Sequence, residues 1–358
     1  MRTIEIALGA SSHSAHVGAG LLDRLGELAL DAGLSAGPCA IITDSNVENL
    51  YAARAADALR KSGFAPTTIS FPAGEASKSA ATLETLYDRM TAANLDRNAA
   101  IFALGGGVAG DLGGFAAATF LRGVPLVQVP TTVVAQVDSS LGGKTGINHR
   151  HAKNLIGAFY QPRLIVADVA TLATLPEREL LEGLAEVIKY GAIMDAPMIA
   201  DLERTLDSIL ARDANVLEDM VARSLAHKAA VVSADEHEGG LRKTLNFGHT
   251  IGHAIEASAG YGKYLHGEAV AIGMVAAARL SSRYAGFSAD EASRLERLIA
   301  RAGLPTELPA GWQTDDFMRA LKLDKKRVEG AVEFVLLDRL GHSLTRRLTI
   351  DEMLSPLG

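Results

Sequence analysis

Short apolar and β-branched runs alternate with helix-like segments through the first half of the chain, and this alternation limits the possible folds more than any other feature. The expected strands are 3–7, 40–43, 67–71, 100–104 and 126–129, and the expected helices are 20–30, 47–61, 80–93 and 108–118. Strands that alternate with helices form a parallel sheet covered on both faces. We therefore predict an α/β, Rossmann-like domain whose ligands bind at the carboxyl ends of the strands.

The pattern changes after residue 170. From Thr171 onward, apolar residues recur mostly at spacings of three and four, which is typical of amphipathic or buried helices. One exception, 331–348, can form a small hairpin around 338–342. We predict an α/β domain at 1–170 and an all-α domain at 171–358, with the active site in the cleft between them.

Composition and charge exclude several classes of protein. The formal net charge is −7 over 358 residues, which argues against a nucleic-acid binder because affinity for the phosphate backbone rests on clustered Lys and Arg. Cys39 is the only cysteine, so we expect neither an intrachain disulfide nor a Cys-rich zinc site, as suits a reducing cytoplasm. No signal peptide is evident, and no apolar stretch reaches the ~20 residues that span a bilayer. We expect a cytoplasmic protein that binds neither nucleic acid nor membrane.

A glycine-rich turn follows one of the later expected strands. Gly105, Gly107 and Gly110 satisfy the GxGxxG spacing between a strand and a helix, where glycine lets a pyrophosphate approach backbone N–H groups. The match alone is weak, because it does not follow the first strand and no suitable acid lies about 20 residues downstream. Asp44, at the end of another strand, is either a helix N-cap or an acceptor for a ribose hydroxyl.

Further polar side chains stand at the ends of expected strands: Glu75 and Lys78, Thr131 and Thr132, and Asp138 and Lys144. Lys144 follows two glycines, so its ammonium lies beside exposed backbone N–H groups, an arrangement that suits a phosphate. The GxxxxGK[ST] spacing is absent, and nucleotide chemistry of the P-loop type is therefore not expected.

The stretch 245–256, LNFGHTIGHAIE, carries two histidines four residues apart. On a helix, His249 and His253 share one face; His266 follows and Glu186 lies upstream. A catalytic zinc ion takes three protein ligands and keeps one position open, so Glu186, His249 and His266 can form such a set, with His253 left for proton transfer or substrate contact. A zinc protease is not expected, since Thr250 stands where that motif needs glutamate. The alternative is that these are unrelated packing or surface residues.

Basic residues gather around this part of the sequence: Lys189, Lys228, Arg242 and the DKK run at 324–326. Asn246 precedes the first histidine by three residues and can hydrogen-bond a hydroxyl or a carboxylate. Each cation can equally be a solvated surface charge, and Lys228 and Arg242 can pair with the acids that lie between them. The spacing allows these groups to converge on an anionic substrate without requiring it.

Long strings in both halves resemble those of the dehydroquinate synthase family, within the sugar-phosphate cyclases. They run in family order from about residue 43 to 326 and include TDSNV, GEASKS, GGGVAGDLGGFAA, FLRGVPLVQVPTTVVAQVDSSLGGKTGIN, KNLIGAFYQP, EGLAEVIKYG, VVSADEHEGGLRKTLNFGHTIGHAIE, LHGEAVAIGM and LDKK. Strings of this length over most of the chain are far more specific than any single motif above. HRHAKN at 149–154 is less typical of the family.

The resemblance implies a 3-dehydroquinate synthase activity: conversion of 3-deoxy-D-arabino-heptulosonate 7-phosphate to 3-dehydroquinate and phosphate, in the shikimate pathway of aromatic amino acid biosynthesis. Such an enzyme is a phosphate-eliminating cyclase, a carbon–oxygen lyase. The resemblance also implies NAD that is regenerated in each turnover, a divalent cation (Zn²⁺ or Co²⁺) and a homodimer. Glu186, His249 and His266 would be the metal ligands.

The resemblance also assigns residues to the cofactor and substrate sites. Those of the NAD site would be Asp44, Asn46, Glu75, Lys78, Gly106, Gly107, Val108, Asp111, Thr131, Thr132, Asp138, Lys144, Lys153, Thr171, Leu172 and Thr174. Those of the substrate site would be Arg122, Asp138, Lys144, Asn154, Lys189, Lys228, Arg242, Asn246, His253 and a lysine of the DKK run, Lys325 or Lys326. Arg122 is expected to reach the phosphate, and a neighbouring subunit can supply it.

Three other functions are compatible with parts of this pattern. A sister cyclase of the 2-deoxy-scyllo-inosose or valiolone synthase type would keep the NAD and metal residues and change the substrate pocket. A metal-dependent polyol dehydrogenase would share the two-domain architecture and release NADH stoichiometrically. A metal-binding protein without catalysis would not need the matching pocket residues.

Overall fold

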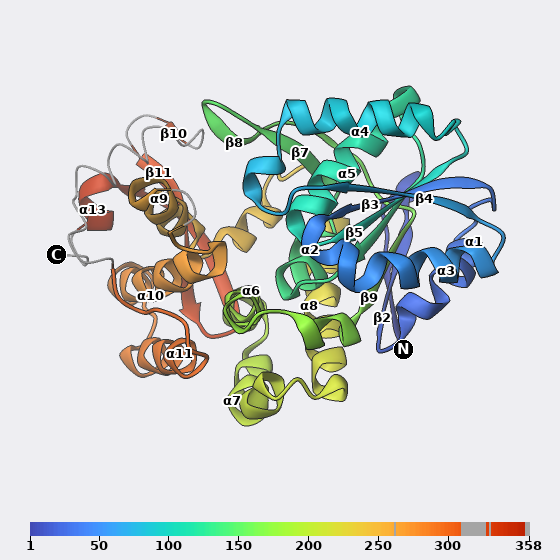
Figure 1. Ribbon diagram of the computed structural model, residues 1–358. Helices are drawn as coiled ribbons and strands as arrows, with labels where there is room; N and C mark the ends of the chain where they lie inside the picture. The colour runs from blue at the N-terminus through green and yellow to red at the C-terminus, as the bar shows by residue number, and fades with distance from the viewer. Residues whose placement is uncertain (261–262, 309–326, 329–330, 355–358) are drawn as a thin grey trace. The chain divides into compact units, whose positions relative to one another are not determined.

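The computed structural model describes residues 1–260, 263–308, 327–328 and 331–354 (Figure 1). Contacts divide the chain into two units, the first formed by Met1–Leu175 and Arg212–Ser233, the second by Pro176–Ala211 and Ala234–Gly358. The first break lies close to the expected boundary at residue 170. No feature of the sequence indicates that a later helix, α8 (Ala214–Ala234), returns to the first unit.

The first unit is built on a seven-stranded sheet with the strand order β1-β2-β9-β6-β5-β3-β4. Its strands are β1 (Arg2–Ile6), β2 (His13–Gly18), β3 (Pro38–Asp44), β4 (Ala65–Phe71), β5 (Ala100–Gly105), β6 (Leu126–Pro130) and β9 (Leu164–Asp168). All neighbouring strands pair in parallel except β1, which is an antiparallel edge strand. The predicted parallel α/β sheet is confirmed, with β2 and β9 as strands that were not among those expected from the sequence.

Helices cover both faces of this sheet, α1 (Leu25–Asp31) and α3 (Ala53–Lys61) on one face, and α4 (Ala80–Ala92) and α5 (Gly107–Thr119) on the other (Figure 1). In β3, Cys39 and Ile41 pack with the first pair of helices, and Ala40 and Ile42 with the second. Successive side chains of a strand point to opposite faces. A strand that is buried on both faces therefore has a continuous run of apolar residues, and this run is what predicted β3 from the sequence.

Short helical turns connect these elements: η1 (Gly9–Ser11), η2 (Leu21–Arg24), α2 (Ser45–Val47), η3 (Glu48–Ala52), η4 (Glu75–Ser77), η5 (Phe120–Arg122), η6 (Ala135–Ser139) and η7 (Val169–Thr174). A separate antiparallel pair, β7 (Lys144–His149) and β8 (Ala152–Phe159), follows the turn that holds Lys144. The sequence pattern gave no strand here. β7 lies so close to α5 that a Cβ at Gly114 would be 2.5 Å from Thr145 Cγ2.

The second unit is largely helical. Its elements are α6 (Glu177–Met194), α7 (Ala196–Leu210), η8 (Leu241–Asn246), α9 (His249–Ala259), α10 (His266–Tyr284), α11 (Ala289–Arg301), β10 (Arg327–Val328), β11 (Ala331–Arg339), β12 (His342–Thr349) and α13 (Ile350–Leu354). The predicted helical C-terminal domain is confirmed in its main part, but it is not all-α, because β11 and β12 form an antiparallel hairpin with β10 on its edge. The hairpin turns between residues 339 and 342, as the one exceptional stretch of the sequence indicated.

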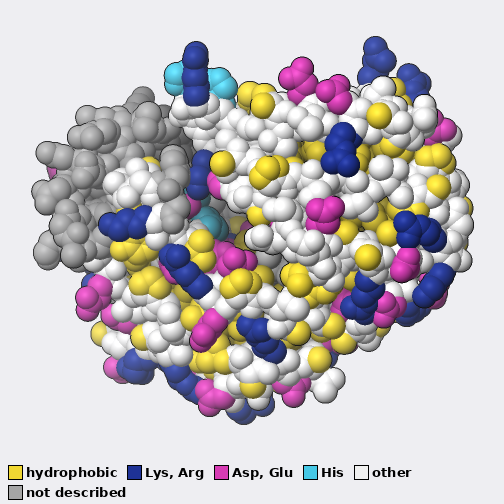
Figure 2. Space-filling model, viewed as in Figure 1, with side chains coloured by type: hydrophobic (Ala, Val, Ile, Leu, Met, Phe, Trp, Pro, Cys, Tyr) yellow, Lys and Arg dark blue, Asp and Glu magenta, His cyan; other side chains and the backbone are white. Residues whose placement is uncertain are grey.

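Two general features of the described residues bear on the class of protein. None of their helices combines the length and the apolar character needed to cross a membrane. Acidic and basic side chains are interspersed over the face that Figure 2 shows.

Candidate active site

The polar residues at the strand ends of the first unit gather along one edge of its sheet. β6, β5, β3 and β4 are parallel neighbours, so their carboxyl ends lie at the same edge. In strand order, this edge carries Thr131 and Thr132 after β6, Gly105–Gly107 after β5, Asp44 after β3, and Glu75 and Lys78 after β4.

The glycine turn after β5 leads into α5, whose first backbone N–H groups have no side-chain cap within the described part of the chain. Gly105 has a φ of +152°, and a Cβ there would lie 2.7 Å from Ala109 Cβ, so only glycine fits without strain. Gly106 is the N-cap of α5, and no side chain of the described residues caps the first N–H groups of this helix. A helix start of this kind can donate to a pyrophosphate.

Asp44 caps the helical segment that follows β3. Its Oδ1 accepts from the backbone N–H groups of Asn46 at 2.9 Å and Val47 at 3.1 Å. The N-cap that the sequence left as one of two options is therefore present. The second oxygen, Oδ2, faces the glycine turn, 3.3 Å from the position of a Cβ on Gly105, and the ribose contact stays a prediction for this atom.

Lys78 is the centre of a buried polar network. Its side chain is 4% exposed, and its Nζ donates to Asp111 Oδ2 and to Asn154 Oδ1. Burial raises the pKa of Asp111, although the neighbouring Lys78 ammonium opposes this shift. Asn154 adopts a φ of +53°, a strained backbone conformation that often marks a functional position.

Asn148 completes this network and was missed by the sequence analysis. Its side chain donates to Glu75 Oε1 at 2.7 Å and accepts from the N–H of Asn154 at 2.8 Å, while its own N–H donates to the carbonyl of Lys78 at 2.8 Å. Asn148 thus connects the β7–β8 pair to Glu75 and Lys78, the residues that follow β4. Nothing in the local sequence pattern distinguishes it from a surface amide.

Lys228 is not a surface charge and pairs with an acid that lies far from it in the sequence. It lies on α8, is 6% exposed, and its Nζ is 2.7 Å from Asp138 Oδ1 and 2.6 Å from the Asp138 carbonyl oxygen. Asp138 lies on η6. Two residues that the family resemblance assigned to the substrate are therefore in direct contact within the first unit.

In the second unit, Glu186, His249 and His266 converge. Each offers a ligand atom, and the three atoms lie within 4.8 Å of one another. Glu186 Oε1 is 3.4 Å from His249 Nε2 and 3.6 Å from His266 Nε2. One carboxylate and two imidazoles are the donor set of many catalytic zinc sites, so the chemistry of these residues fits a divalent transition metal.

The surroundings of the three ligands differ in charge. Lys189, which is 1% exposed, donates to the other Glu186 oxygen, Oε2. Burial, followed by the Lys189 ammonium, lowers the pKa of His249 well below its usual value. Burial also lowers the pKa of His266, but hydrogen bonds to Glu186 and Glu256 outweigh it and raise the pKa to about 10.

His253 lies next to the ligands but is exposed. Its ring centroid is 5.5 Å from that of His249 and 5.8 Å from that of His266. This position, beside the ligands and open to solvent, agrees with a contact to substrate.

Close helix packing brings the ligands together. His266 is the first residue of α10, and a Cβ at the following Gly267 would lie 1.9 Å from the Glu182 carbonyl oxygen of α6. His249 is the first residue of α9, and a Cβ at the preceding Gly248 would lie 2.7 Å from Met274 Cγ of α10. Side chains at these two positions would push the helices apart, and the histidines would move with them.

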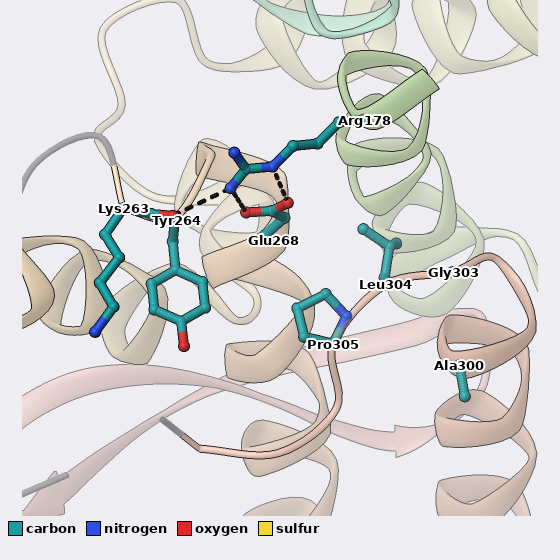
Figure 3. A pocket seen from close by; sticks show the side chains of 8 residues that line it. All are labelled: Arg178, Lys263, Tyr264, Glu268, Ala300, Gly303, Leu304 and Pro305. Atoms are coloured by element: carbon teal, nitrogen blue, oxygen red, sulfur yellow. Dashed lines mark hydrogen bonds and ion pairs between the residues drawn. The ribbon is translucent and has the colours of Figure 1, made fainter. Parts of the chain in front are cut away.

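An ion pair fixes the start of α10. Glu268 Oε2 accepts from the N–H of Leu265 at 2.8 Å, and Arg178 donates to both Glu268 oxygens at 2.7 and 2.8 Å and to the Lys263 carbonyl at 3.1 Å. Figure 3 shows these groups on the wall of a pocket of about 510 Å³, which is also lined by Tyr264, Ala300, Gly303, Leu304 and Pro305. The pair caps α10 at the residue before His266, so its role here is structural.

Arg242 and Asn246 lie on η8, also in the second unit. Arg242 is 2% exposed; its Nη1 donates to the Glu236 carbonyl at 2.6 Å, and its N–H donates to Asp235 Oδ2 at 3.0 Å. Asn246 Nδ2 is 3.4 Å from Glu238 Oε1. Arg242 therefore contacts the loop that precedes it, as one of the two hypotheses from the sequence stated. Because it is buried, Arg242 is not a solvated surface charge.

Several predicted residues lie at the periphery of these clusters or beyond them. Lys325 and Lys326 lie outside the described residues. Thr171 and Leu172 are buried in η7, where Thr171 accepts from Gln136 Nε2 at 3.2 Å, and Thr174 contacts Tyr51. Asn46 lies on α2, Val108 on α5, Lys144 at the start of β7 and Lys153 on β8, and their part in binding stays a prediction.

Solved structures with this fold define the class of protein. The chain is similar to a 2-deoxy-scyllo-inosose synthase complexed with carbaglucose-6-phosphate, NAD⁺ and Co²⁺ (28% identity, 100% of both chains, TM-score 0.89). It is also similar to the 2-epi-5-epi-valiolone synthase of Streptomyces hygroscopicus with NAD⁺ and Zn²⁺ bound (28% identity, 98% of this chain and 97% of that one, TM-score 0.88). Glycerol dehydrogenase from Schizosaccharomyces pombe shares the fold alone (18% identity, 96% and 87% covered, TM-score 0.70). The fold is thus that of the sugar-phosphate cyclases.

Sequence comparison then identifies the family. Residues 68–182 match the family described as 3-dehydroquinate synthase N-terminal, and residues 183–327 match 3-dehydroquinate synthase C-terminal. The chain is 49% identical to the 3-dehydroquinate synthase of Citrifermentans bemidjiense over 97% of its length and 95% of that protein, and 48% identical to that of Geobacter metallireducens over 100% and 99%. The chain belongs to the 3-dehydroquinate synthase family, and it is an enzyme of the lyase class.

Proposed function

We propose that the chain converts 3-deoxy-D-arabino-heptulosonate 7-phosphate to 3-dehydroquinate and phosphate, using NAD and a divalent metal, Zn²⁺ or Co²⁺. The observation that carries this proposal is the convergence of Glu186, His249 and His266 in a chain that is 48–49% identical to 3-dehydroquinate synthases and 28% identical to the sister cyclases. When bound, NAD would supply a reversible hydride acceptor for the C–H of a ring carbon that bears a hydroxyl group, and the metal would polarise the oxygen on that carbon.

Glu186, His249 and His266 would hold the metal in the second unit. The carboxylate and the two Nε2 atoms supply three ligands, and a fourth position remains for substrate oxygens. Lys189 neutralises the Glu186 oxygen that faces away from the histidines, so that Oε1 is the atom left for the ion. His253, exposed beside the ligands, would contact the substrate or transfer a proton.

The glycine turn of the first unit would hold the pyrophosphate of NAD. The uncapped first N–H groups of α5 are available to donate, and Asp44 Oδ2 faces the same turn as an acceptor for a ribose hydroxyl. Thr132 lines the turn, since its Cγ2 would be 3.0 Å from a Cβ on Gly106. Lys78, fixed by Asp111 and Asn154, would complete the site on the β4 side.

Three cations, the buried Arg242 and Lys228 and the exposed Lys144, would bind the acidic groups of the substrate. Arg242 is the residue we assign to the substrate carboxylate, because a planar guanidinium matches a carboxylate in two parallel hydrogen bonds. Lys144 and Lys228 of the first unit would bind the phosphate and stabilise it as it leaves. The departing phosphate can itself accept the proton that elimination removes, so the role of these side chains is positioning and electrostatic stabilisation.

We further propose a homodimer in which Arg122 acts on the phosphate of the partner subunit's substrate. Arg122 is exposed, has a φ of +69° and makes no ion pair among the described residues. Its neighbour Leu121 is 40% exposed, and β8 exposes Leu155, Ile156 and Phe159 at 38%, 41% and 49%. Exposed apolar side chains on an edge strand favour burial against a second copy.

The reaction is tested by incubating the purified protein with the heptulosonate phosphate, NAD⁺ and Zn²⁺ or Co²⁺. We expect phosphate release with no net change in absorbance at 340 nm. Stoichiometric NADH formation would instead indicate a dehydrogenase, and turnover of glucose 6-phosphate in place of the heptulosonate would indicate a sister cyclase. Either outcome overturns the proposal.

The contribution of Arg122 across subunits is tested by mixing two inactive variants. Arg122→Ala and His266→Ala each disable both sites of their own homodimer. A mixed dimer has one site with both residues intact if Arg122 acts in trans, so activity returns on mixing. If Arg122 acts within its own chain, each site of a mixed dimer lacks either Arg122 or His266, and mixing restores nothing.

A further inference from the structure

Glu256 lies on the same helix as one metal ligand and contacts another. It is seven residues after His249 on α9, and its Oε2 is 3.2 Å from Nδ1 of His266. The other nitrogen of that ring, Nε2, is 3.6 Å from Glu186 Oε1. The imidazole of His266 therefore has a carboxylate at each end.

His249, the second histidine ligand, also has an acceptor at each ring nitrogen, but one of the two acceptors is a neutral carbonyl. His249 Nε2 is 3.4 Å from Glu186 Oε1, and its Nδ1 is 3.1 Å from the carbonyl oxygen of Phe247. A neutral imidazole that ligates through Nε2 carries its proton on Nδ1, which then needs an acceptor. Both histidines have that acceptor, a neutral carbonyl for His249 and a charged carboxylate for His266.

The difference between the two acceptors, a carbonyl for His249 and a carboxylate for His266, parallels the exposure of the two rings. The side chain of His249 is 10% exposed and that of His266 is 35% exposed. The buried ring is held by packing, whereas the more exposed ring is free to rotate or to exchange its tautomer with solvent unless another group restrains it. A hydrogen bond to a charged acceptor is about twice as strong as one between neutral groups, so the carboxylate stands where restraint is needed most.

Glu256, His253 and His266 also lie close enough together to hold an ion of their own, with ligand atoms within 4.8 Å. A neutral imidazole has one lone pair for a metal, so His266 can serve only one of the two groups. Glu186 is fully buried, whereas His253 is exposed, and a buried carboxylate between two imidazole nitrogens is the stronger attraction for a cation. His266 Nε2 thus belongs with Glu186, which leaves Nδ1 to donate to Glu256.

We propose that Glu256 is a positioning residue that fixes the ring orientation and the tautomer of His266 and thereby strengthens metal binding at Glu186, His249 and His266. The inference rests on the proposed metal site. Outer carboxylates of this type raise the basicity of the ligating nitrogen, and their loss typically weakens metal affinity 10–100-fold.

The test measures metal affinity in Glu256→Leu, which has no acceptor, and in Glu256→Gln, which keeps a neutral one. Apoprotein is titrated with Zn²⁺ against a chromophoric chelator, and with Co²⁺ while its visible absorption is recorded. We expect about 10–100-fold weaker binding for Glu256→Leu, a smaller loss for Glu256→Gln, an altered Co²⁺ spectrum in both, and one ion per chain throughout. Asp338→Asn is the matched control, because Asp338 Oδ1 is 2.7 Å from Nδ1 of His342, a histidine outside the cluster; its affinity should equal that of wild type.

Two outcomes overturn the inference. One is wild-type affinity and an unchanged Co²⁺ spectrum in both variants, or in Glu256→Gln alone if Glu256→Leu does not fold. The other is two ions bound to wild type and one to the variants, because Glu256 would then be a ligand itself. Failure of the proposed metal site gives a different result, since His266→Ala would then bind one ion as tightly as wild type.

Discussion

In the first unit Gly107, at the start of the helix after the glycine turn, has only a side chain near it, whereas in the second unit the glycines beside the histidines allow backbone of other helices to approach. A Cβ at Gly107 would meet the side chain of Ser139, with Oγ at 3.3 Å and Cβ at 3.9 Å. A Cβ at Gly267 would lie 1.9 Å from the Glu182 carbonyl oxygen. Glycine in a sequence string therefore marks close approach, and only the structure says whether a ligand or another part of the chain approaches.

The difference extends to the groups that bind. The first unit offers backbone N–H groups at the start of α5, whose positions are set by the sheet and the turn. The second unit offers side chains from α6, α9 and α10, whose positions depend on how the helices pack. A nucleotide site of the first kind should tolerate changes in packing, and a metal site of the second kind should not.

The largest effect is expected from removing a ligand. His266→Ala should lose bound metal and turnover together, and because loss of an outer partner already costs 10–100-fold, the loss of a ligand should exceed about 100-fold. Metal content and phosphate release are measured on the same preparation. His253→Ala is the control within the cluster: it should keep the metal and lose turnover. Bound metal at wild-type affinity in His266→Ala would remove this residue from the ligand set.

The next effect tests packing in the second unit. Gly267→Ala places a methyl group against backbone of α6, and overpacking of this kind costs about 1–3 kcal/mol of unfolding free energy. The helices must move apart to relieve it, so metal affinity should fall as well. Urea denaturation and Zn²⁺ titration measure the two. Gly239→Ala, where the nearest atom to a Cβ is Asp235 Oδ1 at 3.6 Å, should change neither, and an unaffected Gly267→Ala would show that the helix contact is not what holds the ligands.

The corresponding change in the first unit should leave stability alone. Gly107 begins α5 with an ordinary helical backbone, so Gly107→Ala should be neutral or slightly stabilising. The added methyl group occupies the approach to the helix N-terminus. A hydrogen bond to a charged group contributes about 1.5–3 kcal/mol, so loss of one should weaken NAD binding at least about tenfold. Calorimetric titration with NAD⁺ measures it; unchanged affinity would place the pyrophosphate elsewhere.

The sequence predicted the parts of the fold whose burial follows from local pattern. β3, β5 and β6 are buried on both faces and appear as apolar runs bounded by glycine, proline or a polar residue. β2 was missed because its sequence, HSAHVG, interrupts the apolar pattern with polar residues. β7 and β8 were missed because they pair through Gly146 and Gly157, where the two backbones approach closely. Glycines add nothing to an alternating apolar pattern, so the pattern did not predict these strands.

The same limit applies to the site. His249 and His253 could be assigned to one helix face from their spacing, and Glu256 follows on that face at i+7, a signal that was present but not used. The contact of Lys228 with Asp138 and that of Lys78 with Asn154 join segments that are far apart in sequence. Such pairs depend on where α8 and the β7–β8 hairpin pack, and local spacing holds no information about that.

The smallest effect is expected at Asp44, where one carboxylate has two assigned tasks. Oδ1 caps the helix that starts at Ser45, and Oδ2 faces the glycine turn. Serine caps a helix about as well as aspartate, whereas alanine does not and costs about 1 kcal/mol. Asp44→Ser should therefore keep the stability of the first unit and lose NAD affinity, while Asp44→Ala should lose both.

The two variants separate the tasks because serine has a single side-chain oxygen. Once that oxygen accepts from the N–H groups of Asn46 and Val47, no acceptor remains for a ribose hydroxyl. Urea denaturation reports the cap, and NAD⁺ titration reports the ribose contact. Wild-type NAD affinity in Asp44→Ser would leave Asp44 as a cap alone, and the first unit would then bind its nucleotide through the backbone of the glycine turn, without help from the neighbouring strand.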